Sequence, residues 1–367
     1  MSVVDDPRAV MTLDAGGTNF VFSAMRANRS AVAPFVLPAH SDDLERSLAS
    51  IKDGFRRVLE SLGGPASAIS FAFPGPCDYF SGIVIRPGNL PAYRDVPLAA
   101  ILEDAFGLPT FINNDGDLFA YGEAMAGFLP YVNGLLEKAG SPKRYRNLLG
   151  VTLGTGFGGG LVRDGQLIIG DNSAAGEVWL IRHKLERGWN AEEGASIRAV
   201  RRAYAAATGT SVEQAPQPKD IFAIAEGTAA GNRDAAREAF RLLGEVAGDA
   251  ISEATTLLDG LVVIGGGIAG AHRQFLPAIV AEMNGGFAAP NDQLRRLVPQ
   301  AFNLEDADEL ATFLKGEAKE LTVPGSGRHV RFDAMPRVGV GISRLGTSEA
   351  TAIGAYAYAL SRLDSKG

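Results

Sequence analysis

The sequence predicts a mixed α/β protein built from two lobes. Its 367 residues exceed the usual length of one compact domain, and 46% of them are hydrophobic, which is enough for a large core. Apolar runs of strand length alternate with amphipathic helical segments, the pattern of α/β folds. A unit of strand, glycine turn and strand also occurs twice, at residues 13–22 and 153–162. This weak internal repeat predicts two lobes of related topology that face each other across a cleft.

Composition excludes several classes of protein. The net charge is −7 and the basic residues form only short groups, at 143–146 and 201–202, so we expect no nucleic-acid partner. The single cysteine, Cys77, rules out an intramolecular disulfide and a multi-cysteine zinc site. The first ten residues lack a signal-peptide pattern, and no apolar run approaches the roughly 20 residues that cross a bilayer. We expect a soluble cytoplasmic protein without a membrane partner.

The first lobe is expected to begin with a β-hairpin. Apolar runs at 9–13 and 20–25 flank the turn AGGTN, a pattern typical of two strands joined by a glycine turn. Apolar residues then recur every three or four positions over 41–62, which predicts a helix capped by Ser41 or Asp42 and ended by Gly63.

The rest of this lobe alternates strands, helices and polar loops. Strands are expected at 68–73, 83–85 and 110–112, and helices at 97–106 and 118–126. The polar run 113–117 follows a strand, where ligands bind in α/β proteins. We expect residues 1–120 to form a small lobe, joined by a C-terminal helix at about 347–367.

The large lobe is expected over residues 121–346, with insertions near 128–147 and 287–345. Strands are predicted at 148–153, 161–162, 261–264 and 329–332, and helices at 199–208, 233–257, 304–314 and 350–363. The last helix is rich in alanine, so it could pack tightly against a neighbour.

Three glycine turns are candidate phosphate or nucleotide sites, because glycine presents backbone N–H groups without side chains in the way. None contains the G-K-[ST] of a Walker A loop, and GTGFGGG is followed by a strand-like run rather than the helix of a Rossmann fingerprint. We expect the first two turns to bind the phosphates of ATP and the third to lie against its base or ribose. The nucleotide-binding residues predicted here are Gly16, Gly17, Thr18, Asn19, Gly154, Thr155, Gly156, Gly265, Gly266 and Gly267.

Two carboxylates are candidates for the chemistry: Asp14 beside the first turn, and Asp115 after two asparagines at the end of a predicted strand. Asp14 precedes the first turn and would repel phosphate unless a cation intervened, so we expect it to bind Mg²⁺ of Mg-ATP directly or through water. Asp115 could take the proton of a hydroxyl that attacks the γ-phosphate. The alternative for both is an Asp that caps its own turn.

Taken together, five segments resemble the ROK family of repressors, open reading frames and sugar kinases, within the actin-like ATPase superfamily. The segments are LDAGGTNF, FAFPGPCDYFSGIVIRPGNL with DVPLAAILEDAFGLPTFINNDGD, GVTLGTGFGGGLVRDGQLIIG, LVVIGGGIAGA and LGTSEATAIGAYAYAL. They occur in the family's order and cover most of the chain. The resemblance implies a two-lobe, ribonuclease H-like fold with ATP and sugar in the cleft between the lobes.

The resemblance also implies roles for single residues. Asp115 matches the family's catalytic base. The positions that match sugar-binding groups are Gly75, Asn89, Asn114, Glu177 and Glu192. A homodimer is suggested by the resemblance alone.

Two departures concern the sugar and the metal. The family's E-x-G-H reads Glu177-Val178-Trp179-Leu180 here, and no zinc-binding cysteine loop follows, so we expect no structural zinc. Either His183, three positions later, or the aromatic face of Trp179 could replace the missing histidine, although a structural role for His183 is the simpler alternative. The family's N-D-A-N also reads N-D-G-D, with Asp117 in place of an amide.

The favoured function is an ATP-dependent, glucokinase-like hexose kinase that phosphorylates the 6-hydroxyl. N-acetylmannosamine, N-acetylglucosamine, fructose and allose remain alternative sugars, because sequence does not show pocket geometry. A family repressor would need a helix-turn-helix domain before the first turn, and only about a dozen residues precede Asp14. A catalytically silent sugar-binding protein is the alternative of another class, and retention of Asp115 opposes it.

Overall fold

The computed structural model describes residues 3–288 and 293–365 of the chain. The chain divides into two compact units. Unit 1 comprises Met1–Gly127, Gly160–Gly176 and Leu345–Gly367, and unit 2 comprises Phe128–Gly159 and Glu177–Arg344. The chain first leaves unit 1 at Gly127, so the lobe boundary expected near residue 120 falls inside a helix that stays whole.

The first sheet has five strands in the order β3-β2-β1-β4-β7. The predicted hairpin is present, because β1 and β2 are antiparallel neighbours around the first glycine turn, while β4 and β7 continue the sheet in parallel. The strands are β1 (Val10–Ala15), β2 (Asn19–Arg26), β3 (Arg29–Pro38), β4 (Ala68–Ala72) and β7 (Thr110–Asn113). A separate small hairpin pairs β5 (Cys77–Asp78) with β6 (Ile83–Val84).

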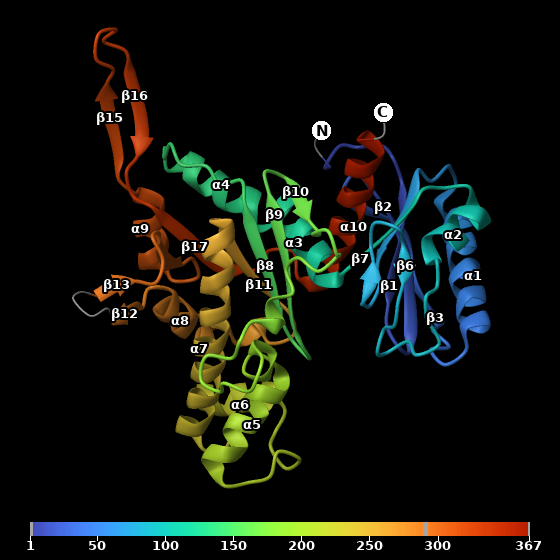
Figure 1. The fold of residues 1–367 in the computed structure, drawn as a ribbon, viewed down its shortest axis with the longest axis horizontal. Helices are drawn as coiled ribbons and strands as arrows, with labels where there is room; N and C mark the ends of the chain where they lie inside the picture. Colours follow the sequence, from blue (N-terminus) through green and yellow to red (C-terminus); the bar gives the residue numbers. More distant parts are fainter. Residues whose placement is uncertain (1–2, 289–292, 366–367) are drawn as a thin grey trace. The chain divides into compact units, whose positions relative to one another are not determined.

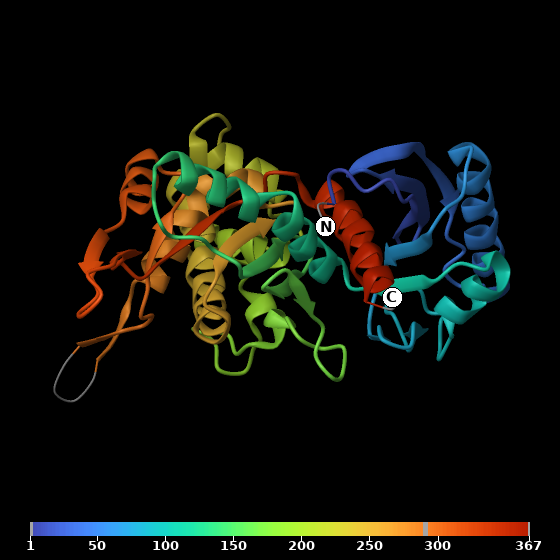
Figure 2. The same cartoon turned by 90° about the horizontal axis from the view of Figure 1, so that it is seen from above.

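Helices cover both faces of this first sheet. Helix α1 packs on β1, β2 and β3, and α10 packs on β1, β2 and β4 from the opposite face, as Figures 1 and 2 show. The helices of unit 1 are α1 (Leu44–Leu62), α2 (Leu98–Phe106), α3 (Asp115–Met125) and α10 (Thr347–Asp364). The alanine-rich last helix packs extensively against α3, as the sequence suggested.

Aromatic rings fill the core under α1. Phe22, Phe55 and Phe71 are fully buried, and each ring lies within 6 Å of the next. Phe73 and Tyr93 extend the same cluster. Rings of this size bury enough apolar area to fix α1 against the sheet.

The second sheet has the order β10-β9-β8-β11-β17-β14. Its first strands repeat the arrangement of the first sheet, with three sequential strands in reverse order followed by parallel ones, so the internal repeat is confirmed. The strands are β8 (Leu148–Leu153), β9 (Phe157–Arg163), β10 (Gln166–Ile168), β11 (Leu261–Gly265), β14 (Gln300–Asn303) and β17 (Arg337–Ile342).

The helices of unit 2 pack around these strands. The long helix α7 contacts α5, α6 and α8, and α8 contacts β14 and β17. The α-helices are α4 (Phe128–Lys138), α5 (Ile197–Thr208), α6 (Pro218–Glu226), α7 (Arg233–Leu258), α8 (His272–Met283) and α9 (Ala307–Lys315). Single 3₁₀ turns are η1 (Val178–Leu180), η2 (Ala191–Glu193) and η3 (Ala269–Ala271).

The region expected as an insertion over 287–345 contains core structure. Strands β14 and β17 lie within it and extend the second sheet, and α9 begins at Ala307 after the cap Asp306. Two hairpins stand outside the sheet: β12 (Gly286–Ala288) with β13 (Gln293–Arg295), and β15 (Ala318–Thr322) with β16 (His329–Asp333), which projects from unit 2 in Figure 1. Residues 289–292 of the expected insertion lie outside the described residues.

Several helix starts differ from the sequence-based expectation, and in two of them a side-chain cap explains the difference. Helix α1 is capped by Asp43, whose side chain accepts from the Arg46 N–H, rather than by Ser41 or Asp42. Helix α3 begins at Asp115, three residues before the expected start at 118, because the Asn114 side chain caps it and acidic residues in the first turn complement the helix dipole. None of the helices in the described part of the chain is long and apolar enough to cross a membrane.

Candidate functional site

The first glycine turn lies against a loop that carries a predicted sugar ligand. The turn closes through a hydrogen bond from the Gly16 N–H to the Asn19 carbonyl oxygen, at 3.1 Å. A Cβ atom at Gly17 would lie 2.9 Å from the carbonyl oxygen of Asn89, so only glycine fits there without movement. The structure therefore brings a predicted phosphate-binding turn and Asn89 into direct contact within unit 1.

Asp14 and Asp115 line the same cavity of unit 1. This cavity has a volume of about 610 Å³, and its polar lining includes Thr12, Ser23 and Thr347. Water reaches the Asp14 carboxylate, but the surrounding protein weakens its solvation. That desolvation, and secondarily the negative charge of Asp115, raises the pKa of Asp14. Two carboxylates facing one cavity are an arrangement that a divalent cation would stabilise.

Asp115 lies at the first position of α3, directly after β7. It is exposed, and its Oδ1 accepts from the Gly116 N–H at 2.9 Å. The Asn114 Oδ1 accepts from the same N–H at 2.7 Å. The turn-capping alternative therefore holds for one carboxylate oxygen of Asp115. The remaining polar atoms of Asp115 are open to a substrate hydroxyl.

Tyr79 is a candidate site residue that the sequence analysis missed. Its hydroxyl would lie 3.1 Å from a Cβ at Gly75, and it interacts with the side chain of Asn114. The ring is buried, and this burial raises the pKa of Tyr79, so the hydroxyl stays protonated as a hydrogen-bond donor. Tyr79 thus links two predicted sugar-binding positions, Gly75 and Asn114. A tyrosine in a loop carries no sequence signal of such a role.

The second and third glycine turns lie side by side in unit 2. A Cβ at Gly154 would be 3.7 Å from the Gly267 nitrogen. Gly266 has φ +91°, and a side chain there would collide with the backbone of Leu153 at the end of β8. The Ile268 N–H donates to the Leu153 carbonyl oxygen at 3.0 Å, which ties the two turns together. The predicted phosphate turn and the predicted adenosine turn therefore form one surface.

Glu192 joins this surface. Its Oε2 accepts from the Phe157 N–H at 3.1 Å, beside Gly156. Its Oε1 forms an ion pair with Arg198 Nη2 at 2.9 Å. Arg198, on α5, is a second residue that the sequence analysis missed. Both partners fix the carboxylate next to the second glycine turn.

Glu177 is positioned by an aromatic neighbour. The Trp179 Nε1–H donates to the Glu177 Oε2. Turn η1 directly follows Glu177, and turn η2 contains Glu192. The two turns contact each other, and the Ala191 N–H donates to the Ile181 carbonyl oxygen at 2.7 Å. The sequence separation of 15 residues between Glu177 and Glu192 is thus bridged by a compact loop. The indole N–H group of Trp179 orients the Glu177 carboxylate within that loop.

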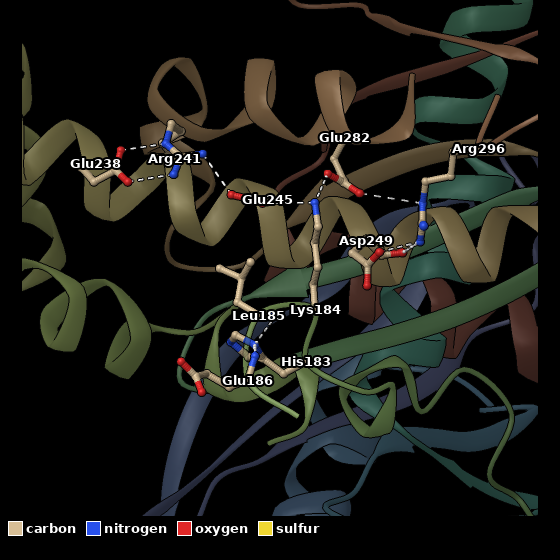
Figure 3. Close-up of polar contacts among 10 residues, drawn as sticks. All are labelled: His183, Lys184, Leu185, Glu186, Glu238, Arg241, Glu245, Asp249, Glu282 and Arg296. Atoms are coloured by element: carbon tan, nitrogen blue, oxygen red, sulfur yellow. Dashed lines mark hydrogen bonds and ion pairs between the residues drawn. The ribbon is translucent and has the colours of Figure 1, made fainter. Parts of the chain in front are cut away.

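His183 has a structural role in the same loop. Its buried ring accepts two backbone hydrogen bonds at Nδ1, from the Leu185 and Glu186 N–H groups at 3.1 and 3.0 Å (Figure 3). The ring also packs edge-on against Trp189, whose other neighbour is the Arg202 guanidinium, 4.5 Å from the ring centroid. These contacts of His183 are all made within the loop that carries it, in line with the alternative of a structural role for this residue.

The neighbouring Lys184 connects this loop to two helices. Its Nζ forms ion pairs with Glu245 of α7, at 3.1 Å, and with Glu282 of α8, at 2.5 Å (Figure 3). Arg241 and Glu238 extend the chain of charges along α7. Because the groups are only partly exposed, the pairs hold the loop more firmly than isolated surface ion pairs would. The loop with the two predicted sugar-binding glutamates is thereby fastened to the helical side of unit 2.

Acidification is expected to loosen this loop. Burial lowers the pKa of His183 below its ordinary value of about 6.5, and the nearby charges of Glu186, Glu193, Asp249 and Arg202 modify the shift. A lowered pKa means that the unfolded chain binds the proton more readily. The contribution of neutral His183 to the free energy of unfolding is therefore fully present above about pH 6.5 and is lost as the pH falls below it.

The test compares wild type with His183→Asn, whose amide oxygen can replace the Nδ1 acceptor but does not titrate. Thermal unfolding would be followed by tryptophan fluorescence at pH 8.0 and 5.5, since both tryptophans, Trp179 and Trp189, belong to the loop. Between pH 8.0 and 5.5 the melting temperature of the wild type should fall further than that of the variant. Equal losses would contradict the role of His183.

Within the described residues, the candidate site residues fall into two groups. Unit 1 holds the first glycine turn, Asp14, Gly75, Asn89, Asn114 and Asp115, and unit 2 holds the second and third turns, Glu177 and Glu192. No group of three or more His, Cys, Asp or Glu side chains arranged to hold a metal ion occurs in the described part of the chain. Each group combines glycine turns with side chains suited to hydroxyl recognition.

Comparison with known proteins finds solved structures that are similar over nearly the whole chain. The crystal structure of a glucokinase from Parabacteroides distasonis is 50% identical, with a TM-score of 0.91 over 98% of this chain and 99% of that one. A glucokinase of the ROK family from Streptomyces griseus, solved with glucose and AMPPNP, shares the fold at 21% identity, with a TM-score of 0.60 over 95% of this chain and 98% of that one.

Curated relatives match over a shorter span. The N-acetyl-D-glucosamine kinase of Vibrio cholerae is 30% identical over 184 residues, which are 50% of this chain and 56% of that protein. The chain thus spans about half the length of the curated relatives it matches. The profile of the ROK family matches residues 10–295, well over half of the sequence. With its mixed α/β two-lobe, actin-like fold, this chain belongs to the ROK family.

Proposed function

We propose that this protein is an ATP-dependent hexose kinase that transfers the γ-phosphoryl group of ATP to the 6-hydroxyl of glucose. The observation that carries the proposal is the pair Asp14 and Asp115, which line one cavity beside the first glycine turn. The likeness at 50% identity to a glucokinase, over 98% of the chain, supports glucose as the sugar. The AMPPNP bound to the Streptomyces griseus enzyme supports ATP as the donor.

In this proposal Asp115 is the general base. The sugar hydroxyl oxygen attacks the γ-phosphorus while its proton passes to the Asp115 carboxylate. The bond from the γ-phosphorus to the bridging oxygen breaks, and ADP leaves. An exposed carboxylate suits this role, because it can approach the hydroxyl directly.

The glycine turns and a divalent cation hold the phosphates. The N–H groups of Gly16 and Gly154 close their own turns, so the backbone N–H groups of residues 17–18 and 155–156 donate to phosphate oxygens. The turn 265–267 lies against the nucleoside. Desolvation, and secondarily the charge of Asp115, raises the pKa of Asp14, and a cation would stabilise the ionised form of both carboxylates. Asp14 would therefore hold Mg²⁺ directly or through water. When bound, the ion would neutralise charge on the transferred phosphoryl group.

Sugar recognition is assigned to polar groups of each unit. Asn89, Asn114 and the backbone at Gly75 supply neutral donors and acceptors, and Glu177 and Glu192 accept hydrogen bonds from sugar hydroxyls. Glu192 is already oriented by the Phe157 N–H and Arg198. A site built in this way discriminates strongly against sugars that leave one of its polar groups unpaired.

N-acetylglucosamine is the second candidate substrate, because several curated relatives at about 30% identity are N-acetyl-D-glucosamine kinases. The proposal also includes a cytoplasmic location, which suits a chain with one cysteine, and the homodimer that the family resemblance suggests. Sedimentation velocity would test the dimer.

The deciding experiment is a coupled assay of ADP release with Mg-ATP and a panel of sugars. The panel contains glucose, N-acetylglucosamine, N-acetylmannosamine, fructose and allose, with ATP alone as the control. We expect the highest kcat/KM with glucose. Highest activity with an N-acetylhexosamine would redirect the substrate assignment, and absence of sugar-dependent ADP release would favour the silent sugar-binding protein.

A further inference from the structure

A second cavity lies in unit 2 at the edge of the sheet opposite the glycine turns. Its volume is about 420 Å³. It lies where the strands begin: Lys143 precedes β8, residues 295–299 precede β14, and Arg337 begins β17. The glycine turns follow the other ends of β8 and β11. Strands of five or six residues separate the two edges by roughly 16–20 Å, so this cavity is distinct from the proposed nucleotide surface.

Four cationic side chains line the cavity, and two of them already have acidic partners. Arg296 pairs with Asp249 at 2.6 Å (Figure 3), and Arg337 pairs with Asp333 at 2.7 Å. Lys143 and Arg295 also line it. Neither has an acidic side chain within ion-pair distance among the residues that the structure describes. Even with the carboxylate of Asp259, which also lines it, the cavity has an excess of positive charge that an anion would compensate.

A buried hydroxyl in the cavity wall lacks a partner. Thr255 of α7 is 2% exposed, and its Oγ1 makes no hydrogen bond to any described residue. The adjacent Thr256 differs, because its hydroxyl donates to the Ser252 carbonyl oxygen at 2.8 Å. Leaving a buried hydroxyl unsatisfied destabilises a protein, and such groups usually find a partner. A ligand acceptor in the cavity would satisfy Thr255.

We propose that this cavity binds a phosphorylated small molecule. Three segments supply donors, namely Lys143, Thr255 and Arg295, and a phosphoryl group offers three terminal oxygens to receive them. The cavity is larger than a phosphate ion. Its remaining walls are apolar at Leu297 and Pro336, while the carboxylate of Asp259 can accept a hydroxyl of the ligand body. The inference does not rest on the proposed kinase activity.

Calorimetric titration with a matched pair of ligands tests the chemistry. Glycerol 3-phosphate and glycerol differ only in the phosphoryl group, and inorganic phosphate serves as the minimal probe. We expect saturable binding of glycerol 3-phosphate, weaker binding of inorganic phosphate and none of glycerol. Binding of both glycerol compounds, or of neither, would contradict a phosphoryl site.

Variants locate the binding. Arg295→Gln and Lys143→Met should each weaken the affinity for glycerol 3-phosphate by about 10-fold or more, because charge-assisted hydrogen bonds are lost. Thr255→Val keeps the shape of the side chain and should weaken it by roughly 3- to 10-fold. Thr256→Val and Arg328→Gln are the matched controls, since the Thr256 hydroxyl is already bonded and Arg328 lies in the distant turn before β16. Both controls should bind like wild type.

A second measurement keeps the result independent of binding elsewhere, for example at the glycine turns. Val298 lines the cavity and is 83% exposed, so Val298→Cys can carry an environment-sensitive fluorophore. Cys77 is buried, and burial raises the pKa of its thiol to about 12, so it should not compete for the label. The fluorescence should respond to glycerol 3-phosphate with the affinity seen by calorimetry. Unchanged affinity in Arg295→Gln and Lys143→Met, or a silent label, would overturn the proposal.

Discussion

Asp115→Asn should reduce turnover in the proposed kinase reaction by about 10²- to 10⁴-fold, the usual contribution of a general base. The amide keeps the shape of the side chain and an oxygen that can accept from the Gly116 N–H, so α3 should still begin at the same residue. It cannot take the proton of the attacking hydroxyl. The coupled ADP-release assay with glucose measures the loss in kcat.

Sugar affinity separates this effect from a damaged pocket. Glucose binding to Asp115→Asn, measured by calorimetry, should stay within a few fold of wild type, because the substitution preserves hydrogen bonding. Asp104→Asn, an exposed position on α2, is the charge-matched control and should have wild-type turnover. Turnover of Asp115→Asn close to wild type would remove Asp115 from the mechanism.

Gly122→Ala and Gly354→Ala should each destabilise unit 1 by about 1–3 kcal/mol or more, as overpacking does in tightly packed cores. A Cβ at Gly122 would lie 1.9 Å from the Ala350 carbonyl oxygen, and a Cβ at Gly354 would lie 1.8 Å from that of Leu118. Both obstacles are backbone atoms, so α3 and α10 must move apart. Hydrogen exchange of the peptides that cover α3 and α10 should become faster in both variants.

The matched control is a glycine in a helix with free space around it. Gly134 lies inside α4, and a Cβ there would meet no atom within 4 Å. Gly134→Ala should therefore stabilise the protein by roughly 0.5–1 kcal/mol, since alanine has the better helix propensity. A Gly354→Ala variant as stable as wild type in urea denaturation would show that the two helices are not held at this distance.

Much of the fold could be predicted from local sequence. The hairpin around AGGTN, the helix over 41–62 and the buried strand at 261–264 each carry a strong period or a glycine turn, and all three are present near their expected bounds. Helix ends were less predictable. Asp43 rather than its two neighbours caps α1, because a cap depends on backbone geometry that three polar residues in a row cannot distinguish.

The long stretch before the last helix was the weakest part of the prediction. Strand β17 was not expected, although Val338 and Val340 are buried in it. Its remaining positions include glycines that leave room for side chains of other elements, for instance Phe128 against Gly341. A strand whose partners include β11 and Phe128, both distant in the chain, gives little local signal.

By itself, the sequence determined the glycine turns, the two-lobe α/β repeat and the position of Asp115 after a strand, because turns and periodic apolar runs depend on neighbouring residues. Tertiary structure alone decided which groups meet. It placed Asn89 against Gly17 and brought the turns at Gly154 and Gly267 together. It also directed the His183 ring into hydrogen bonds within its own loop and placed the unpartnered Thr255 hydroxyl in the wall of a cationic cavity. These contacts link residues far apart in the chain, and their distances follow from packing rather than from local propensity.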